Sequence, residues 1–442
     1  MAFIDILIIL VLATLPAYFF KKKLGIEIYG PLCLWRTKKG LKLLDRLSRY
    51  KRFLTALSEI GFIFAFGVIG AGYLFLRTKR RLKDLLKVVL AYIVFLAGAS
   101  VVAVPAIFTS DAVPAELLVT LSIGGTGFFI LHALLLNSWI IIQDYLTGAA
   151  PIPGLGLLVP GVEIPGSPIS IPLHAIFGLI VLIVVHEVAH GVVARMEQIK
   201  VKSMGLLTAG IFPIGAFTEP DEKQLKRVQT IKRMRVFSVG SMSNFVFGII
   251  FLVLFLALLQ LVQPQFVQDP TSIVPSYIPL TEEYTKYLTI TFVQNNSPAQ
   301  NAGISPGMKF YNIDLIYAEK TPFANQPLVT DNGTITVQRN ASGYLGLSYM
   351  KNIEYPPFVL FEKYLIESIF WIFILNFLIG VINYLPFAIF DGARIFEDLI
   401  EFYAKRLGIK NKKTGRRVVK VLTVFILILL VINALPYFID KF

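Results

Sequence analysis

The sequence predicts an all-α polytopic membrane protein that also contains a membrane-associated β-hairpin and an inserted extracytoplasmic α+β domain. Composition is the first observation: the 442 residues have a mean hydropathy of +0.69, and only 16% of them are charged. Soluble globular chains contain about 25% charged residues. A deficit of this size over this length argues against a soluble protein and against disorder. The other two observations are a series of long apolar stretches and an uneven distribution of basic residues.

Eight stretches are long enough, or nearly so, to cross a bilayer core of about 30 Å, which needs about 20 apolar residues in a helix. Within them the only Lys, Arg, Asp or Glu side chain is Glu187. The first stretch is short, but it lacks a small-residue cleavage site, so we interpret it as a retained helix rather than a signal peptide. The eight stretches are residues 6–20, 60–76, 88–110, 117–143, 173–194, 236–262, 368–390 and 421–439.

The basic residues indicate the orientation of the chain in the membrane. Lys and Arg number 42 against 28 Asp and Glu, and 29 of the 42 lie in residues 21–52, 195–235 and 391–420. Residues 263–363 contain six basic and eight acidic side chains. Because cytoplasmic loops are enriched in Lys and Arg, the three basic segments are predicted to be cytosolic and 263–363 to be outside. The net charge of +14 is therefore a topology signal, and no nucleic-acid partner is expected.

One basic segment conflicts with this topology. Eight passes with both termini outside would place residues 77–87, which contain six Lys or Arg, on the outer side. The rule on basic loops disfavours that position. We therefore leave open that one segment between residues 53 and 146 is re-entrant or interfacial.

Residues 186–190 read His-Glu-Val-Ala-His within the fifth apolar stretch. Positions i and i+4 share one face of a helix, so His186 and His190 can bind one Zn²⁺ ion, with Glu187 beside it. Zinc lowers the pKa of a bound water molecule, and a neighbouring carboxylate can accept its proton. Ionisable groups within a membrane helix are costly and usually functional. The pattern therefore predicts a catalytic zinc site rather than a pair of packed histidines.

A catalytic zinc ion usually has three protein ligands, so a third ligand must come from elsewhere in the chain. Asp391 is the best candidate, because it follows an apolar stretch that Pro386 kinks, at the same predicted depth as the two histidines. Two alternatives stay open. Asp391 could only cap a helix at 393–407, or a glutamate, Glu397 or Glu401, could be the third ligand.

The remaining candidates receive ordinary structural interpretations. His132 is expected to pack or to form an interhelical hydrogen bond, and His174 to lie near the outer surface, far from the metal. Cys33 is the only cysteine, which excludes an internal disulfide and an all-cysteine metal site. The acidic run at 219–222 is expected to begin a basic helix at 223–235, because acidic residues suit a helix N-terminus.

Four features in order resemble the site-2 protease family of intramembrane zinc metalloproteases, over roughly residues 150–440. The first is His-Glu-Val-Ala-His-Gly at 186–191, and the fourth is the pattern N-x-x-P-x-x-x-x-D-G at 383–392. Between them, residues 205–222 are similar to the membrane-associated β-hairpin of the family, and residues 240–244 to its G-x-x-x-N motif. The position before the aspartate is often Leu in the family and is Phe390 here, a hydrophobic exchange that should not affect the chemistry.

The resemblance implies Zn²⁺ ligands at His186, His190 and Asp391, with Glu187 as the base. It further implies a zinc endopeptidase that cuts transmembrane segments of membrane proteins near their cytosolic side, in regulated intramembrane proteolysis. Its substrates would already be trimmed on the outer side, and the released fragments would often be regulators of transcription. Residues 292–316 resemble a PDZ domain of the kind inserted between core helices, which would act as a filter or sensor.

These predictions divide the chain into four parts. Residues 1–150 are expected to form accessory transmembrane helices, and residues 263–363 the extracytoplasmic PDZ-like domain. The catalytic core is split around that domain, with its first part at 151–262 and its second part at 364–442.

The predicted hairpin at 205–217 suggests how a transmembrane substrate is held. A helix must unwind before its peptide bonds can be attacked, and an exposed strand edge can hold the unwound segment by backbone pairing. No charge occurs between Lys202 and Glu219, which favours a re-entrant element over a cytosolic loop. The candidate substrate-binding or site-shaping residues are Gly210, Ile211, Phe212, Asn244 and Asn383. The two asparagines have an equally weighted alternative as interhelical polar contacts.

Two other classes of function were weighed. A catalytically idle scaffold or chaperone that binds transmembrane helices would not need His186, Glu187, His190 and Asp391 together. A zinc or ion transporter would place polar residues across several helices rather than at one depth. The expected partners are transmembrane substrates and membrane lipid, and the sequence leaves the oligomeric state open. The expected location is a prokaryotic, archaeal-type cell membrane, with the active site toward the cytosol.

Overall fold

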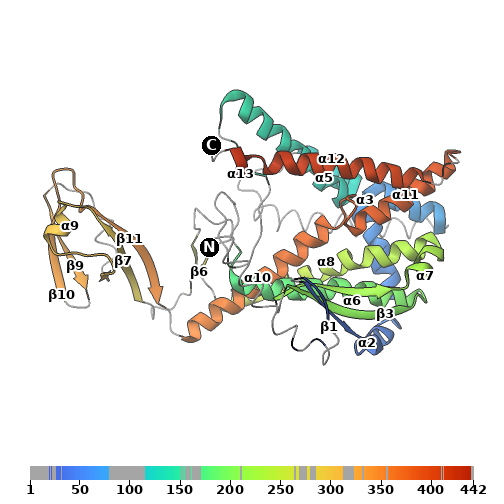
Figure 1. Cartoon of the computed structure of the whole chain (residues 1–442), viewed down its shortest axis with the longest axis horizontal. Coiled ribbons are helices and arrows are strands. Elements are labelled where there is room, and N and C mark those ends of the chain that lie inside the picture. Colours follow the sequence, from blue (N-terminus) through green and yellow to red (C-terminus); the bar gives the residue numbers. More distant parts are fainter. Residues whose placement is uncertain are drawn as a thin grey trace. The chain divides into compact units, whose positions relative to one another are not determined.

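The computed structural model is mostly helical and divides into two compact units (Figure 1). Unit 1 comprises residues 1–261, 267–276 and 367–442, and unit 2 comprises residues 262–266 and 277–366. The described residues are 26–30, 32–78, 115–149, 171–209, 212–262, 265–267, 276–278, 285–311, 323–330, 333–354, 357–409 and 413–439, with a few isolated positions between these ranges.

Six helices among the described residues are long and apolar enough to cross a membrane. They match six of the eight predicted stretches; the other two, 6–20 and 88–110, lie outside the described ranges, as does most of the 77–87 loop. A short 3₁₀ turn, η1 (Leu173–Ala175), precedes the third of them. The six are α3 (Lys51–Thr78), α5 (Ala115–Thr147), α6 (Ile176–Met196), α8 (Thr230–Val262), α10 (Pro357–Ile382) and α12 (Thr414–Ala434).

Two of these helices are broken where they meet. The backbone leaves the helical region at Phe66 and Gly67 (φ 49°) in α3, and at Gly125 (φ 71°) in α5. A Cβ atom on Gly67 would lie 2.0 Å from the Ile123 carbonyl oxygen, and one on Gly125 would lie 2.6 Å from the Phe64 carbonyl oxygen. Glycine is required at both positions, because the positive φ and the short contact each exclude a side chain.

The broken helices support the segment that leads to Asp391. The Thr126 hydroxyl donates to the Phe64 carbonyl at 3.0 Å, which satisfies a backbone group that the break in α3 frees. Next along α5, Gly127 lies so close to the Tyr384 carbonyl oxygen that a Cβ would be 2.5 Å from it. The N-terminal helices are therefore packed directly against the segment that follows α10.

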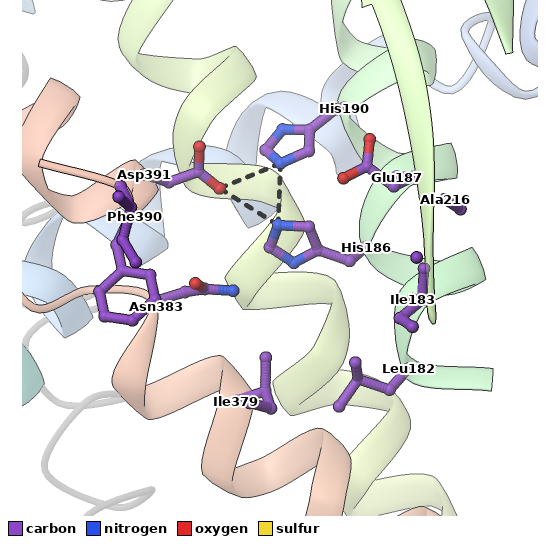
Figure 2. A pocket seen from close by; sticks show the side chains of 12 residues that line it. Leu182, Ile183, His186, Glu187, His190, Ala216, Ile379, Asn383, Phe390 and Asp391 are labelled. Atoms are coloured by element: carbon purple, nitrogen blue, oxygen red, sulfur yellow. Dashed lines mark hydrogen bonds and ion pairs between the residues drawn. The ribbon is translucent and has the colours of Figure 1, made fainter. Parts of the chain in front are cut away.

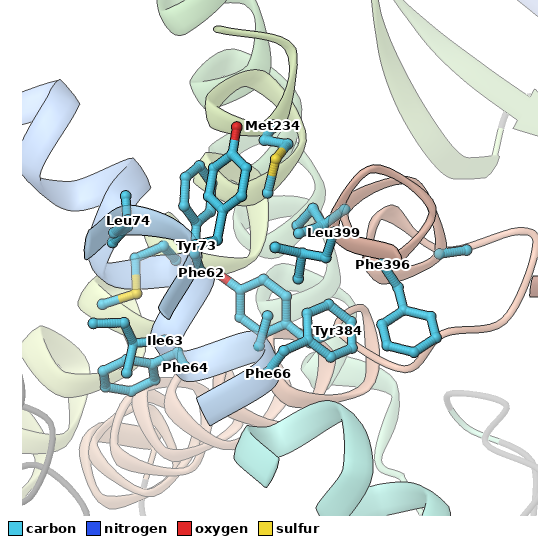
Figure 3. Packing of buried hydrophobic residues seen from close by; sticks show 14 of the residues in the cluster. Phe62, Ile63, Phe64, Phe66, Tyr73, Leu74, Met234, Tyr384, Phe396 and Leu399 are labelled. Atoms are coloured by element: carbon cyan, nitrogen blue, oxygen red, sulfur yellow. The ribbon is translucent and has the colours of Figure 1, made fainter. Parts of the chain in front are cut away.

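A large buried cluster surrounds Tyr384 and joins α3, α8 and α11 (Asp391–Arg406) (Figure 3). The Phe66 ring packs on Phe396 of α11, with 5.0 Å between the ring centroids. The Tyr384 hydroxyl donates to the Ser238 carbonyl of α8 at 3.0 Å. The burial of Tyr384 therefore holds the end of α10 against α8 through both apolar contact and a hydrogen bond.

Buried ion pairs join the same helices. Arg235 of α8 donates to Glu59 of α3 at 2.5 Å and to Glu197, at the end of α6, at 2.7 Å. Arg233 forms a two-point pair with Asp398 of α11. Burial raises the pKa of the Asp398 carboxyl, and the Arg233 guanidinium opposes that shift. Because an unpaired buried charge is strongly destabilising, these pairs restrict how α8 can sit against its neighbours.

A four-stranded antiparallel sheet has the order β1-β2-β3-β4, and β4 contacts α6 (Figure 1). β3 (Val201–Ala209) and β4 (Phe212–Pro220) form the predicted hairpin, longer than the expected 205–217. β1 (Ile26–Tyr29) and β2 (Leu32–Thr37) were not predicted, and they add to the helices expected for residues 1–150. These strands are short and their partner β3 is distant in sequence, so neither composition nor periodicity revealed them.

Charged side chains also cross this sheet. Arg36 on β2 pairs with Glu27 on β1 at 3.1 Å and with Glu219 on β4 at 2.6 Å. Ser203 on β3 donates to the same Glu219 carboxylate at 2.6 Å. A short helix, α2 (Leu41–Leu47), follows β2 and contacts α6. The N-terminal hairpin is therefore attached to the predicted hairpin by side chains as well as by backbone pairing.

The acidic run before the predicted helix at 223–235 does begin a helix, but that helix is shorter than expected. α7 (Glu222–Arg227) starts with Asp221 as its N-cap, whose carboxylate accepts from the Gln224 amide. That bond lowers the pKa of the Asp221 carboxyl. Val228 is extended (ψ 164°), so the chain breaks there and resumes at Thr230 as α8. The single helix predicted over 223–235 is wrong for this reason.

Unit 2 has its own apolar core under a three-stranded sheet of order β11-β7-β8. Its strands include β7 (Thr285–Val293) and β10 (Gly333–Gln338). The other elements of this region and of the C-terminus are β5 (Gln265–Val267), β6 (Ser276–Ile278), α9 (Pro298–Asn301), β8 (Lys309–Phe310), β9 (Asn325–Thr330), β11 (Leu347–Glu354) and α13 (Pro436–Ile439).

The helix crossing at Gly125 can be tested against a glycine of similar φ in open space. Gly148 has φ 77°, and nothing lies within 4 Å of its Cβ position. Gly148→Ala should therefore cost only the strain of positive φ, about 1–2 kcal/mol. Gly125→Ala adds a clash with the α3 backbone, so we expect a much larger fall in the melting temperature of the purified protein in detergent. Equal falls would contradict the close crossing.

Candidate active site

The His-Glu-x-x-His segment lies in the second half of α6. His186 and His190 lie one turn apart, and their rings meet edge to face with 4.6 Å between centroids. Their Nε2 atoms are 3.0 Å apart. The helical spacing predicted from sequence therefore places both ring nitrogens at one point (Figure 2).

Asp391 reaches the same point from the start of α11. Its Oδ2 atom lies 3.2 Å from Nε2 of His186 and 3.0 Å from Nε2 of His190. Phe390 holds the N-cap position, and no side chain caps the helix. Asp391 is thus the first helical residue, and Figure 2 shows its carboxylate turned toward the histidines.

The three side chains fit a zinc ion. Two imidazole nitrogens and one carboxylate oxygen form a donor set that catalytic zinc sites use, and all three atoms lie within 4.8 Å of one another. Four tetrahedral ligands at about 2.0–2.1 Å from zinc would be roughly 3.3 Å apart, close to the distances observed here. Among the described residues this is the group that could hold a metal, and it leaves a fourth position for water or substrate.

Glycine in α8 leaves room for this group. A Cβ atom on Gly240 would lie 2.5 Å from Nε2 of His190 and 2.7 Å from Cε1 of His186. Both rings therefore pack directly on the α8 backbone. Gly240, the first residue of the G-x-x-x-N pattern, is needed because a side chain there would clash with the imidazoles. The sequence did not reveal this reason.

The outer nitrogens of both imidazoles have partners on α8. Nδ1 of His190 lies 2.6 Å from the Val236 carbonyl oxygen, so the ring donates there and Nε2 keeps its lone pair. Nδ1 of His186 lies 3.2 Å from Nδ2 of Asn244, and Oδ1 of the same carboxamide has no partner. With the amide turned so that Oδ1 faces the ring, Asn244 accepts from Nδ1 and fixes the same tautomer. Asn244 therefore contacts a predicted metal ligand.

Glu187 is held by strand β4. The Thr218 amide donates to Oε2 of Glu187 at 2.8 Å, and the Thr218 hydroxyl donates to the Glu187 carbonyl at 2.6 Å. Thr218 approaches this closely because α6 has Gly191 beside it, where a Cβ would lie 2.8 Å from Cγ2 of Thr218. The sequence did not single out Thr218, since only the pairing of the sheet brings it to α6.

A cavity of about 380 Å³ opens on the metal ligands (Figure 2). Asn383 lines it, and so do Gly215 and Ala216 of β4, which sequence reasoning missed. Gly210 and Ile211 lie outside the described residues, and Phe212 begins β4 without a described side chain. The other lining residues are Leu182, Ile183, His186, Glu187, His190, Ile379, Ile389, Phe390 and Asp391.

A second, larger cavity of about 1,070 Å³ adjoins the first and shares Ile389, Phe390 and Asp391 with it. Its other walls come from the end of β4, from α7 and from α11, and most of its side chains are charged. Thr218 and Glu219 line it, so β4 runs from the first cavity into the second. The metal ligands therefore line the first cavity, and Asp391 also borders this second, polar compartment.

The loop that carries Asp391 is compact. The Gly392 amide donates to the Asn383 carbonyl at 2.8 Å, which closes the loop. A Cβ on Gly392 would lie 2.2 Å from the Tyr384 carbonyl oxygen. The N-x-x-P-x-x-x-x-D-G pattern thus describes one closed turn, in which the last residue contacts the first two.

The remaining candidates lie elsewhere. Glu397 pairs with Arg416 at 3.5 Å, and Glu401 accepts from the Gly415 amide at 3.1 Å. Nδ1 of His132 lies 2.7 Å from the Thr120 hydroxyl. His174 pairs with Glu367 at 3.3 Å. None of these four belongs to the group of possible metal ligands among the described residues.

A polytopic membrane protein with two histidines and an aspartate around a possible metal position has the features of a membrane metallohydrolase. Comparison with protein families is consistent with this class: the model of peptidase family M50, the site-2 protease family, matches residues 174–431, more than half of the chain. The chain belongs to this family, whose members are membrane-embedded metalloproteases.

Similarity to a single curated protein is weaker. An uncharacterized protein of Methanocaldococcus jannaschii is 26% identical over 295 residues, which cover 66% of this chain and 72% of that protein. The similarity extends the family relationship to an archaeal protein but assigns no activity.

Metal content should separate Asp391 from the two glutamates. We expect Asp391→Ala to weaken zinc binding by more than the roughly 10–100-fold that loss of an outer-shell partner costs, because it removes a ligand. Glu397→Ala and Glu401→Ala should bind zinc like the unaltered protein. Zinc per chain, measured by elemental mass spectrometry after dialysis against a graded chelator, gives the comparison. Normal zinc in Asp391→Ala would exclude it as a ligand.

Gly240 allows a second test with a control in the same helix. Gly240→Ala places a methyl group against both imidazoles and should lower the zinc content sharply. Gly248→Ala, two turns further along α8, meets its nearest atom at 3.4 Å and should retain zinc. If both variants fold and retain the metal equally, the rings do not pack on Gly240 as described.

Proposed function

We propose that this protein is an intramembrane zinc endopeptidase that hydrolyses a peptide bond within the transmembrane segment of membrane-protein substrates. The observation that carries the proposal is the convergence of His186, His190 and Asp391, with Glu187 beside them, on a cavity between apolar helices. Family membership supports metalloprotease chemistry. The intramembrane substrate is inferred from the position of the cavity along helices of membrane-spanning length.

The chain's own residues supply the acid–base part of the reaction. When bound, zinc would acidify a water molecule and polarise the scissile carbonyl. His186 and His190 are held with Nε2 free for the metal, and Asp391 adds a negative charge that favours a cation there. Glu187 would accept a proton from the attacking water at a carboxylate oxygen and deliver it to the leaving amine nitrogen.

The substrate must be unwound before this chemistry can take place. A transmembrane helix satisfies its backbone hydrogen bonds internally, so exposing one peptide bond in lipid leaves polar groups without partners. Strand β4 is an edge of the sheet and lines the cavity at Gly215 and Ala216. Backbone pairing with this edge would satisfy the unwound segment. Leu182, Ile183 and Ile379 form an apolar wall that suits an aliphatic side chain.

The polar compartment suggests the route of water and product. Its charged lining would admit water to Asp391 without crossing lipid, and would accept the polar flank of the substrate. The basic segments around it support a cytosolic position for this compartment under the positive-inside rule. We propose, accordingly, a multi-pass protein of a prokaryotic cell membrane that releases a cytosolic fragment.

Unit 2 fits a role in selecting substrates. It has its own core, and Ser297 caps α9 within the segment that resembles a PDZ domain. A folded domain outside the membrane would exclude substrates with large extracytoplasmic parts, so trimming by another protease would precede cleavage. A scaffold or chaperone of the same fold stays the alternative function.

Glu187→Gln distinguishes the protease from the scaffold. The change removes the base but none of the three ligands, so zinc content should be unchanged. We expect cleavage of a co-reconstituted transmembrane substrate to fall by ~10²–10⁴-fold, the usual contribution of general acid–base catalysis. Gel analysis of the substrate together with zinc content measures both. Undiminished cleavage would overturn the role of Glu187, and a zinc-free, inactive parent protein would favour the scaffold.

A further inference from the structure

Strand β4 exposes only part of its edge. In an antiparallel pair, alternate residues direct their N–H and C=O groups toward the partner strand, and the others direct them away. Thr218, opposite Met204 of β3, donates its amide to Glu187 and so belongs to the outward set. By the same alternation Ala216, opposite Leu206, directs its amide and carbonyl outward, whereas Phe217 and Gly215 face β3.

The nearest residues of β4 that, like Ala216, direct their backbone groups away from β3 have no free amide hydrogen. The Thr218 amide is occupied by the Glu187 carboxylate. Pro220, opposite Val201, has no amide hydrogen. On the other side the register shifts at a bulge, after which Pro213 stands opposite Thr208 in the outward set, again without a donor. Ile214 is the additional residue of this bulge and lies outside the alternation.

Ala216 is therefore the position on this edge where a second strand can exchange a full pair of hydrogen bonds. It lies in the wall of the cavity that contains the metal ligands. Two residues further along, a distance of about 7 Å in a strand, the same β4 holds the base Glu187. The distance between the pairing position Ala216 and the base Glu187 is therefore set by two residues of β4.

We propose that β4 binds the unwound substrate through one residue pair at Ala216, with the Thr218–Glu187 hydrogen bond ending the pairing edge. This inference rests on the proposed protease function and adds what selects the bond that is cut. The substrate residue paired with Ala216 determines which peptide bond lies beside Glu187 and the metal ligands. The backbone register fixes the spacing between the paired residue and the bond that is cut, and side-chain pockets select the residue that pairs.

The first experiment scans the substrate backbone. The probe is a synthetic peptide of about 20 apolar residues flanked by lysines, prepared as a series in which one backbone carbonyl at a time is replaced by a thiocarbonyl, which accepts hydrogen bonds more weakly. Binding to the full-length Glu187→Gln variant with zinc is measured in detergent, so that the result does not require turnover. We expect about tenfold weaker binding from the thiocarbonyl at the one substrate position that accepts from the Ala216 amide. Similar losses at several alternate positions would indicate a long pairing edge and overturn the inference.

The second experiment frees the blocked amide. Glu187→Ala removes the acceptor of the Thr218 amide, whereas Gln at position 187 still offers an oxygen to it. In the Ala variant, a thiocarbonyl two residues from the first sensitive position should also weaken binding, because the freed Thr218 amide now pairs with the acceptor there. An unchanged pattern in Glu187→Ala would show that the Thr218–Glu187 bond does not limit pairing.

The third experiment changes the pairing residue itself. Ala216→Pro removes the outward amide but none of the bonds to β3, and Ala216→Gly retains the amide as the matched control. We expect the Pro variant to retain zinc and lose at least tenfold in cleavage rate, and the Gly variant to cut the same bond as the parent. Full activity of Ala216→Pro at the same bond would refute pairing at Ala216.

The outcomes separate this inference from the proposed function. If the parent protein cuts the peptide but thiocarbonyl substitution and Ala216→Pro have no effect, only the register inference fails. If the unmodified peptide is neither bound nor cut, the proposed function fails, and the register inference fails with it.

Discussion

Three donor atoms within about 3 Å of one another, placed among apolar helices, are the constraint on which the rest of this structure depends. Two imidazoles and a carboxylate at this distance are costly to desolvate unless a shared cation compensates them. The surrounding fold brings them together from two helices that are some 200 residues apart in sequence. α8 lies behind both histidines and supplies a carbonyl, a carboxamide and the space at Gly240.

Close packing at glycines connects the three donor atoms to the elements around them. Gly191 admits Thr218 beside the catalytic helix, and Gly392 closes the loop before α11. Gly127, in a helix outside the family match, packs on the same loop at Tyr384. The loop that presents Asp391 is thus supported on one side by α8 and on the other by the broken N-terminal helices. The buried ion pairs of Arg233 and Arg235 also hold α8 against the helices around it.

The sheet links substrate binding to the chemistry. β4 contacts the base at Thr218, forms the cavity wall at Ala216 and continues into the charged compartment. A strand edge is a suitable device in lipid because it replaces the hydrogen bonds that an unwinding helix loses. The N-terminal strands β1 and β2 cover the other side of β3, so the hairpin presents only one free edge at the active site.

By itself the sequence determined the class of protein, the six described membrane helices and the identity of the possible ligands. Apolar length, basic loops and a motif on one helical face are local properties, and local patterns are readable without a fold. The sequence also led to Asp391, but it left capping and the glutamates open, because orientation at a kink depends on packing. Tertiary structure alone decided that Asp391 faces the histidines, that Thr218 holds Glu187, and that residues 26–37 extend the sheet. Each of these needs backbone groups distant in sequence to meet, and no local periodicity records such a meeting.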